Sequence, residues 1–169
     1  VENGSGTIDG ADVEDVLVRC TTTVSFSINA GLNDAWFNLD TDGQGFLISV
    51  LPEAETVFLA WFTYDTALPP EDAVAHLGDP GHRWLTAQGP YAGDTATLTI
   101  YVTEGGVFDA TDPPANNDGI GDGTMSIEFA GCTEGLVTYE IPSLGLSGEI
   151  PIQRITEDNV VLCETLVDQ

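Results

Sequence analysis

Hydrophobic and polar side chains alternate with a period of two along much of this chain. In Thr95–Thr103 the apolar side chains of Ala96, Leu98, Ile100 and Val102 occupy every second position. The same alternation recurs in stretches rich in β-branched residues, namely Val24–Ile28, Phe46–Leu51, Thr124–Phe129, Val137–Ile141 and Ile150–Ile155. Because successive side chains of a strand point to opposite faces, each stretch predicts a β-strand with one buried face.

One further segment, Val57–Tyr64, is apolar at nearly every position. In an extended strand Trp61 points to one face, while Phe58 and Phe62 point to the other. We therefore expect a central strand covered on both sides, with one set of rings in the core and the other beneath the long loops, a partner or a ligand.

Helical periodicity is nearly absent from the sequence. The short helix candidates are Ala11–Arg19 and Pro70–Leu77, and the second begins with a proline that suits a first helical turn. Glycine-rich turns separate roughly eight to ten predicted strands, a number typical of barrels and sandwiches. The sequence thus predicts an all-β fold, an antiparallel up-and-down β-barrel, with a β-sandwich as the alternative.

The chain of 169 residues fits a single domain. We expect residues 22–169 to form the barrel-like domain and residues 1–21 to form an N-terminal extension. Within the extension, Val13–Val18 suits a strand donated to a neighbouring sheet, or a capping segment. Two long loops, 65–82 and 107–122, interrupt the strand pattern, and loops of this length usually carry function or move.

Charge excludes some partners. The chain has no lysine and three arginines against 28 acidic residues, a formal net charge of −25. Nucleic acids and anionic membranes are bound through Lys and Arg, so we expect neither as a partner. No apolar run approaches the roughly 20 residues that span a bilayer, so membrane insertion is not expected.

Three cysteines, Cys20, Cys132 and Cys163, lack the C-x-x-C spacing of zinc and redox centres. Cys132 and Cys163 both follow late strand-like segments, which favours a disulfide between them, with Cys20–Cys163 as the alternative. In a secreted protein two of the three cysteines would pair and one would be left over. The remaining cysteine is then a small buried hydrophobe or a link between subunits.

Two loops combine Asn, Asp and Gly as calcium-binding loops do. Residues 38–43 match the start of an EF-hand-type loop, but Ser49 stands where that loop ends in a bidentate glutamate. The candidate Ca²⁺ ligands are Asn38, Asp40 and Asp42 in this loop, and Asn116, Asp118 and Asp122 in the other. Solvated turns are the competing interpretation, and no other cofactor is predicted.

Catalytic signatures are weak. Gly145-Leu146-Ser147-Gly148 is followed by Glu149 where the nucleophile motif G-x-S-x-G needs glycine, and no pair of carboxylates stands out. We therefore expect a non-enzymatic protein. Aromatic residues gather in the first half of the chain, and the candidates for a ligand or partner surface are Trp36, Trp61, Trp84 and Tyr91. Barrel core is the competing interpretation of these rings.

Several segments together resemble a recurrent β-rich domain of secreted and cell-surface bacterial proteins, a domain without an established biochemical function. They are Ile28–Glu53, Phe58–Thr66, Gly78–Leu98, Gly105–Asp109 and Ile150–Thr156, and the resemblance spans about residues 26–165. This resemblance implies a secreted protein with an extracellular or cell-surface location, and it transfers no catalytic residue. Ala35–Asn38 also resembles the first strand of avidin-like barrels, over that short segment alone.

These observations lead to two functional hypotheses. The first is an exported structural or adhesive subunit that self-assembles through its N-terminal extension or binds another extracellular protein. The second is a β-barrel module that binds a carbohydrate or another small ligand through the first-half aromatics and the 65–82 loop.

Overall fold

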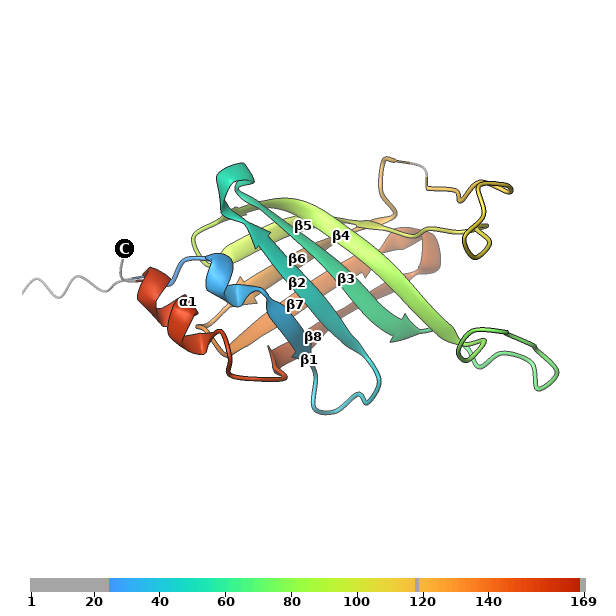
Figure 1. Ribbon diagram of the computed structural model, residues 1–169, viewed down its shortest axis with the longest axis horizontal. Coiled ribbons are helices and arrows are strands. Elements are labelled where there is room, and N and C mark those ends of the chain that lie inside the picture. Colours follow the sequence, from blue (N-terminus) through green and yellow to red (C-terminus); the bar gives the residue numbers. More distant parts are fainter. Residues whose placement is uncertain (1–24, 118, 168–169) are drawn as a thin grey trace, which may run out of the picture.

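The computed structural model describes residues 25–117 and 119–167. These residues form a closed barrel of eight antiparallel strands, each hydrogen-bonded to the next in chain order and the last to the first (Figure 1). The strands are β1 (Asp34–Phe37), β2 (Gly45–Leu51), β3 (Thr56–Tyr64), β4 (His82–Ala92), β5 (Thr95–Tyr101), β6 (Gly123–Phe129), β7 (Glu134–Ile141) and β8 (Leu146–Arg154). The predicted all-β, up-and-down barrel is confirmed.

The helical elements differ from those predicted. Pro70–Leu77 is not helical, because its apolar side chains Val74 and Leu77 are 81% and 70% exposed and have no surface to pack against. The other candidate, Ala11–Arg19, lies outside the described residues. The sequence pattern missed helix α1 (Val160–Val167), which follows the last strand, and the single-turn 3₁₀ helices η1 (Ala30–Leu32), η2 (Pro52–Ala54) and η3 (Pro142–Leu144).

Alternation along each strand fills the barrel interior, as the period of two predicts. In β5 the side chains of Leu98 and Ile100 are buried, and in β6 those of Ile127 and Phe129 are buried with them. Val24–Ile28 is the exception among the predicted strands: residues 25–28 are not in a strand, although Ile28 is part of the core.

The outer face of β3 is not covered as expected. Trp61 points into the barrel, but Phe58 and Phe62 on the opposite face are 39% and 45% exposed. The long loops extend from one end of the barrel and do not fold back over this face (Figure 1). Within residues 25–117 and 119–167 the outer face of β3 is therefore left partly exposed, and its cover by a partner or a ligand stays a prediction.

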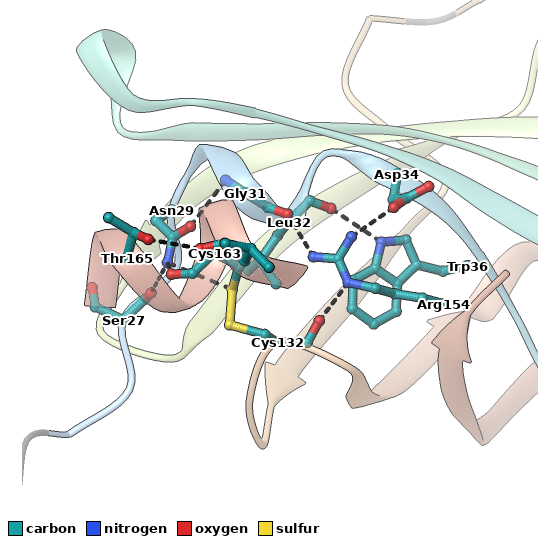
Figure 2. The surroundings of a disulfide bond; sticks show 11 residues. Ser27, Asn29, Gly31, Leu32, Asp34, Trp36, Cys132, Arg154, Cys163 and Thr165 are labelled. Carbon is teal, nitrogen blue, oxygen red and sulfur yellow. Dashed lines mark hydrogen bonds and ion pairs between the residues drawn. A yellow bond between two sulfur atoms is a disulfide. The ribbon is translucent and has the colours of Figure 1, made fainter. Parts of the chain in front are cut away.

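One end of the barrel is closed by η1, α1 and a disulfide bond (Figure 2). Cys132, after β6, and Cys163, in α1, are joined with their sulfur atoms 2.07 Å apart, which is the pairing favoured from the sequence. Gly31 of η1 lies directly against the backbone of Cys163, so that a β-carbon there would collide with α1. The helix is thus held over the barrel end by a covalent bond and by close packing.

The opposite end carries the connections between β1 and β2, β3 and β4, β5 and β6, and β7 and β8. The two longest, residues 65–81 and 102–122, project from the barrel there (Figure 1). Among the described residues, the helical element at this end is the single turn η3 in the β7–β8 connection, whose Ser143 and Leu144 line the cavity mouth. The asymmetry between a plugged end and a loop-framed end decides where a ligand can enter.

Candidate functional site

A cavity of about 1060 Å³ opens at the loop-framed end of the barrel. Its deepest lining side chains include Phe46, Trp61 and Tyr139, which come from β2, β3 and β7. The Phe46 and Trp61 rings stack with centroids 5.4 Å apart, and Tyr139 meets Trp61 edge-on at 5.1 Å. These three rings form the aromatic floor of the cavity.

Strand register places these rings together. Phe46 and Trp61 are direct cross-strand partners on β2 and β3, and both point inward by alternation. Tyr139 reaches them because its partner across β7 and β8 is Gly148, where a β-carbon would stand 3.0 Å from the Tyr139 hydroxyl oxygen. A glycine at this position therefore leaves the room that the Tyr139 ring occupies.

Apolar side chains form the wall of the cavity between the aromatic floor and the entrance. They are contributed by several strands and the segments that follow them, and comprise Leu85, Val102, Ile141, Leu146 and Ile150. Small-molecule sites in proteins are typically lined by apolar side chains together with a few polar groups that orient the ligand. The wall therefore favours a ligand with a substantial apolar or ring surface.

The rim of the cavity is polar and internally hydrogen-bonded. The Thr63 hydroxyl donates to the side-chain oxygen of Gln44 at 2.7 Å, which ties β3 to the β1–β2 loop. The Asp122 carboxylate accepts a 2.7 Å hydrogen bond from the backbone N–H of Val102 and fixes the base of the β5–β6 loop. Glu104 forms an antiparallel bridge with Asn116 within that same loop. These contacts order the entrance.

Pairing is short between β1 and β8, the two strands that close the barrel beside the cavity. Strands β1 and β8 pair only at Trp36–Arg154 and Phe37–Gln153, because Asn38 begins a turn in which its side-chain oxygen accepts from the Asp40 N–H at 2.8 Å. The adjoining stretch of β8 contains Pro151, which pairs with Leu136 of β7 but has no paired residue on the β1 side. A proline lacks an N–H and is tolerated at such a strand edge. The cavity reaches this seam, so its lining includes Gln44 as well as Glu149 of β8.

The aromatic candidates from the sequence fall into two groups. Both Trp61 and Trp84 are lining residues, Trp61 at the cavity floor and Trp84 at its edge. Trp84 pairs with the outward-facing Phe62, so its side chain is on the outer face of the barrel, and the residue is 54% exposed. Trp36 is fully buried at the closed end, where its ring lies under the Arg154 guanidinium, and Tyr91 also packs against the core near that end. Trp36 and Tyr91 are therefore outside the cavity.

Tyr91 has the one clear electrostatic perturbation among the described residues. Burial, and to a smaller extent the negative charge of Glu55, raise the pKa of the Tyr91 phenol above its ordinary value of 10.0. The two residues are neighbours because the Tyr91 N–H donates to the Glu55 carbonyl at 3.2 Å. This perturbation belongs to the closed end and has no part in the cavity.

Sequence reasoning missed Phe46, Leu85 and Tyr139 as cavity residues. The alternation of β2 and β7 did place Phe46 and Tyr139 on inward faces. What the pattern could not supply was the end of the barrel that stays open, because that depends on α1 and on the disulfide. An inward-facing position in the strand pattern does not tell whether a side chain lines the cavity floor or packs in the barrel core.

The candidate calcium ligands lie in two different loops, Asn38, Asp40 and Asp42 between β1 and β2, and Asn116 and Asp122 between β5 and β6; Asp118 lies outside the described residues. In residues 25–117 and 119–167, no three His, Cys, Asp or Glu side chains gather in a way that could hold a metal ion. The Asn38 oxygen instead stabilises its own turn, and Asp122 stabilises the β5–β6 loop. Calcium binding stays a prediction.

None of the helices within the described ranges has the length and apolar character needed to cross a bilayer. Comparison of the chain with models of known protein families, with characterised proteins and with solved structures gives no match.

Proposed function

We propose that this protein binds a small molecule in the open end of its barrel. The observation that carries the proposal is the cavity of about 1060 Å³ with the aromatic floor of Phe46, Trp61 and Tyr139. Its volume matches the upper range of ligand pockets, roughly 300–1,000 Å³. The barrel thus supports the second of the two sequence hypotheses, a ligand-binding module.

Burial of ligand surface supplies the driving force. Each square ångström of apolar surface removed from water contributes about 25 cal/mol, so a ring system seated on the aromatic floor gains several kcal/mol before ordering costs. Tyr139 is the least buried of the three rings, and an aromatic ring of this kind is a surface on which aromatic compounds and sugar rings stack. Both ligand types, a ring-bearing small molecule and a carbohydrate, are consistent with this floor.

The Cys132–Cys163 disulfide indicates an oxidising environment. Together with the acidic surface and the resemblance to domains of exported proteins, it supports the proposal that the protein is secreted and works outside the cell or on its surface. A binding barrel in that location would capture or carry a compound from the surroundings.

The test is binding of a neutral apolar dye, N-phenyl-1-naphthylamine, followed by its fluorescence. The variant Thr63→Trp adds bulk at the inward-facing cavity mouth, and the matched control Phe62→Trp adds the same side chain one position away on the exposed outer face. We expect the first variant to weaken binding about tenfold and the control to bind normally. Equal dye affinity in all three proteins, or none in the parent protein, would remove the proposal.

A second candidate function is self-association, the first of the sequence hypotheses. What supports it is an apolar strip on the outer faces of β2, β3 and β4, formed by Leu47, Phe58, Phe62 and Trp84, each between 39% and 54% exposed. Phe62 and Trp84 are cross-strand partners, so the strip is continuous there. Exposed apolar patches of this kind mark interaction surfaces.

Light scattering of the full chain tests this second function. Because a net charge of −25 opposes association, oligomers should form at high salt and dissociate at low salt. Phe62→Lys should prevent their formation, and deletion of residues 1–19 should do so if the N-terminal extension donates a strand. A monomer at every salt concentration would eliminate self-association.

A further inference from the structure

The mouth of the cavity is strongly acidic. Its lining contains four carboxylates, Asp65, Glu104, Asp122 and Glu149, and a single basic side chain, Arg83. The carboxylates come from three segments, the β3–β4 loop (Asp65), the β5–β6 loop (Glu104 and Asp122) and β8 (Glu149), so they do not form one patch on one side of the entrance. A ligand that enters the cavity must therefore pass through a region of negative potential.

Arg83 does not offset this potential for an incoming anion. One of its terminal nitrogens bonds the Asp65 carboxylate at 2.6 Å, and the other bonds the backbone carbonyls of Pro80 and His82 at 2.8 and 2.7 Å. The Arg83 charge is thus paired with Asp65, and its other terminal N–H groups bond carbonyls at the end of the β3–β4 loop and the start of β4. The net contribution of the other three carboxylates remains.

No other arginine or lysine in the described ranges lines the cavity. Arg154 is buried at the closed end, where it binds Asp34 and lies over Trp36. Arg19 lies outside the described residues, and the chain has no lysine. Among the described residues, an anionic ligand would consequently meet an acidic entrance whose one arginine, Arg83, is already paired with Asp65.

The aromatic floor of the cavity also favours a positively charged ligand. Tyr139 is the least buried ring of the floor, since Phe46 and Trp61 stack on each other and are 3% and 7% exposed. The face of an aromatic ring carries the negative part of its quadrupole, which attracts cations within about 6 Å of the ring centre. Aromatic floor and acidic rim together form a site whose inner surface is apolar and whose whole field favours positive charge.

On this basis we propose that the ligand is a small organic cation, an amine with an aromatic or other apolar body. The inference rests on the proposed function and narrows it. The apolar body occupies the wall and floor, and the ammonium group lies against a ring face or among Glu104, Asp122 and Glu149. Carboxylates are then a selectivity device, since they repel an acid of the same shape.

The experiment compares three probes that share one ring system: 2-naphthylmethylamine, 2-naphthylmethanol and 2-naphthoate, titrated by calorimetry into the full chain at low salt. We expect the amine to bind at least about tenfold more tightly than the alcohol, and the carboxylate to bind most weakly. The advantage of the amine should shrink as salt is added, because screening weakens the rim charges.

Charge-neutralising variants assign the effect to the rim. Glu149→Gln and Glu104→Gln should each weaken amine binding about three- to tenfold and leave alcohol binding unchanged. Glu128→Gln is the matched control, since Glu128 faces outward on β6 and is not part of the cavity lining, yet its loss changes the total charge equally. It should leave both affinities within about twofold.

The possible outcomes distinguish a failure of the cation preference from a failure of the proposed binding function. Equal affinity for amine and alcohol, or tighter binding of the carboxylate, would overturn the cation preference and leave the binding cavity in place. An amine preference that Glu128→Gln reduces as much as Glu149→Gln would overturn the role of the rim. Failure of all three probes to bind would reject the proposed function itself.

Discussion

The guanidinium of Arg154 lies 4.7 Å from the centre of the Trp36 ring and bonds the Asp34 carboxylate at 2.7 Å. It also donates to the backbone carbonyls of Cys132 and Gly31, while the Trp36 indole N–H donates to the Leu32 carbonyl at 3.1 Å. One buried cation therefore connects β8, β1, η1 and the disulfide turn (Figure 2). This network holds the closed end together.

Arg154→Ala should lower the free energy of unfolding by about 3–5 kcal/mol, because it leaves the largely buried Asp34 carboxylate without its cationic partner and the Cys132 and Gly31 carbonyls without the donor that Arg154 supplies. Arg83→Ala supplies a matched comparison. Arg83 also pairs with an aspartate, at 2.6 Å, but the two side chains are 49% and 39% exposed. Its loss should cost about 0–1 kcal/mol. Urea unfolding measures both, and similar losses for the two variants would contradict the structural role of Arg154.

Gly31→Ala should destabilise the protein although the change adds only one methyl group. The new β-carbon would collide with the Cα and N atoms of Cys163, and α1 cannot retreat freely because the disulfide fixes it. Overpacking of this kind costs about 1–3 kcal/mol.

The control for Gly31→Ala is Gly131→Ala, since nothing lies within 4 Å of a β-carbon built at Gly131. Thermal unfolding should show a lower Tm for the first variant and little change for the second. If both variants melt like the parent protein, α1 does not pack on η1 as described.

Tyr91 should make stability fall at alkaline pH. Its pKa is raised in the folded protein, so the unfolded chain loses the phenolic proton first, near pH 10.0, while the folded protein still holds it. The stabilising contribution is complete below that pH and disappears as the pH rises through the folded-state pKa.

Tyr91→Phe should flatten this alkaline decline, and Glu55→Gln should reduce it in part, because burial is the larger cause and the Glu55 charge the smaller. Chemical denaturation between pH 9 and 11.5 gives the slopes. A slope that is identical in Tyr91→Phe and the parent protein would show that this residue does not contribute.

Much of the fold follows from local pattern. Alternation in Thr95–Thr103 and Thr124–Phe129 predicted β5 and β6, and it correctly placed Leu98 and Ile127 inside. Sequential spacing of the strands favoured the up-and-down barrel that is observed. Period-two patterns succeed here because each strand has one face in the core and the other in water.

Other features depend on contacts between distant segments. Helix α1 is short and does not stand out in sequence, since it is held by Cys132 and by Gly31 and not by a strong helical pattern of its own. Its position decides which end of the barrel is closed and hence which inward-facing rings line a cavity. The same aromatic type therefore serves as core at Trp36 and as floor at Trp61.

The most direct test of the binding cavity is an NMR titration of the full chain with 2-naphthylmethylamine, observing the indole N–H signals of its tryptophans after assignment by Trp→Phe variants. Trp61 lies at the cavity floor and Trp36 at the closed end. We expect the Trp61 signal to shift in a saturable manner while the Trp36 signal stays in place. A Trp61 signal that does not move, or a shift confined to Trp36, would contradict the account.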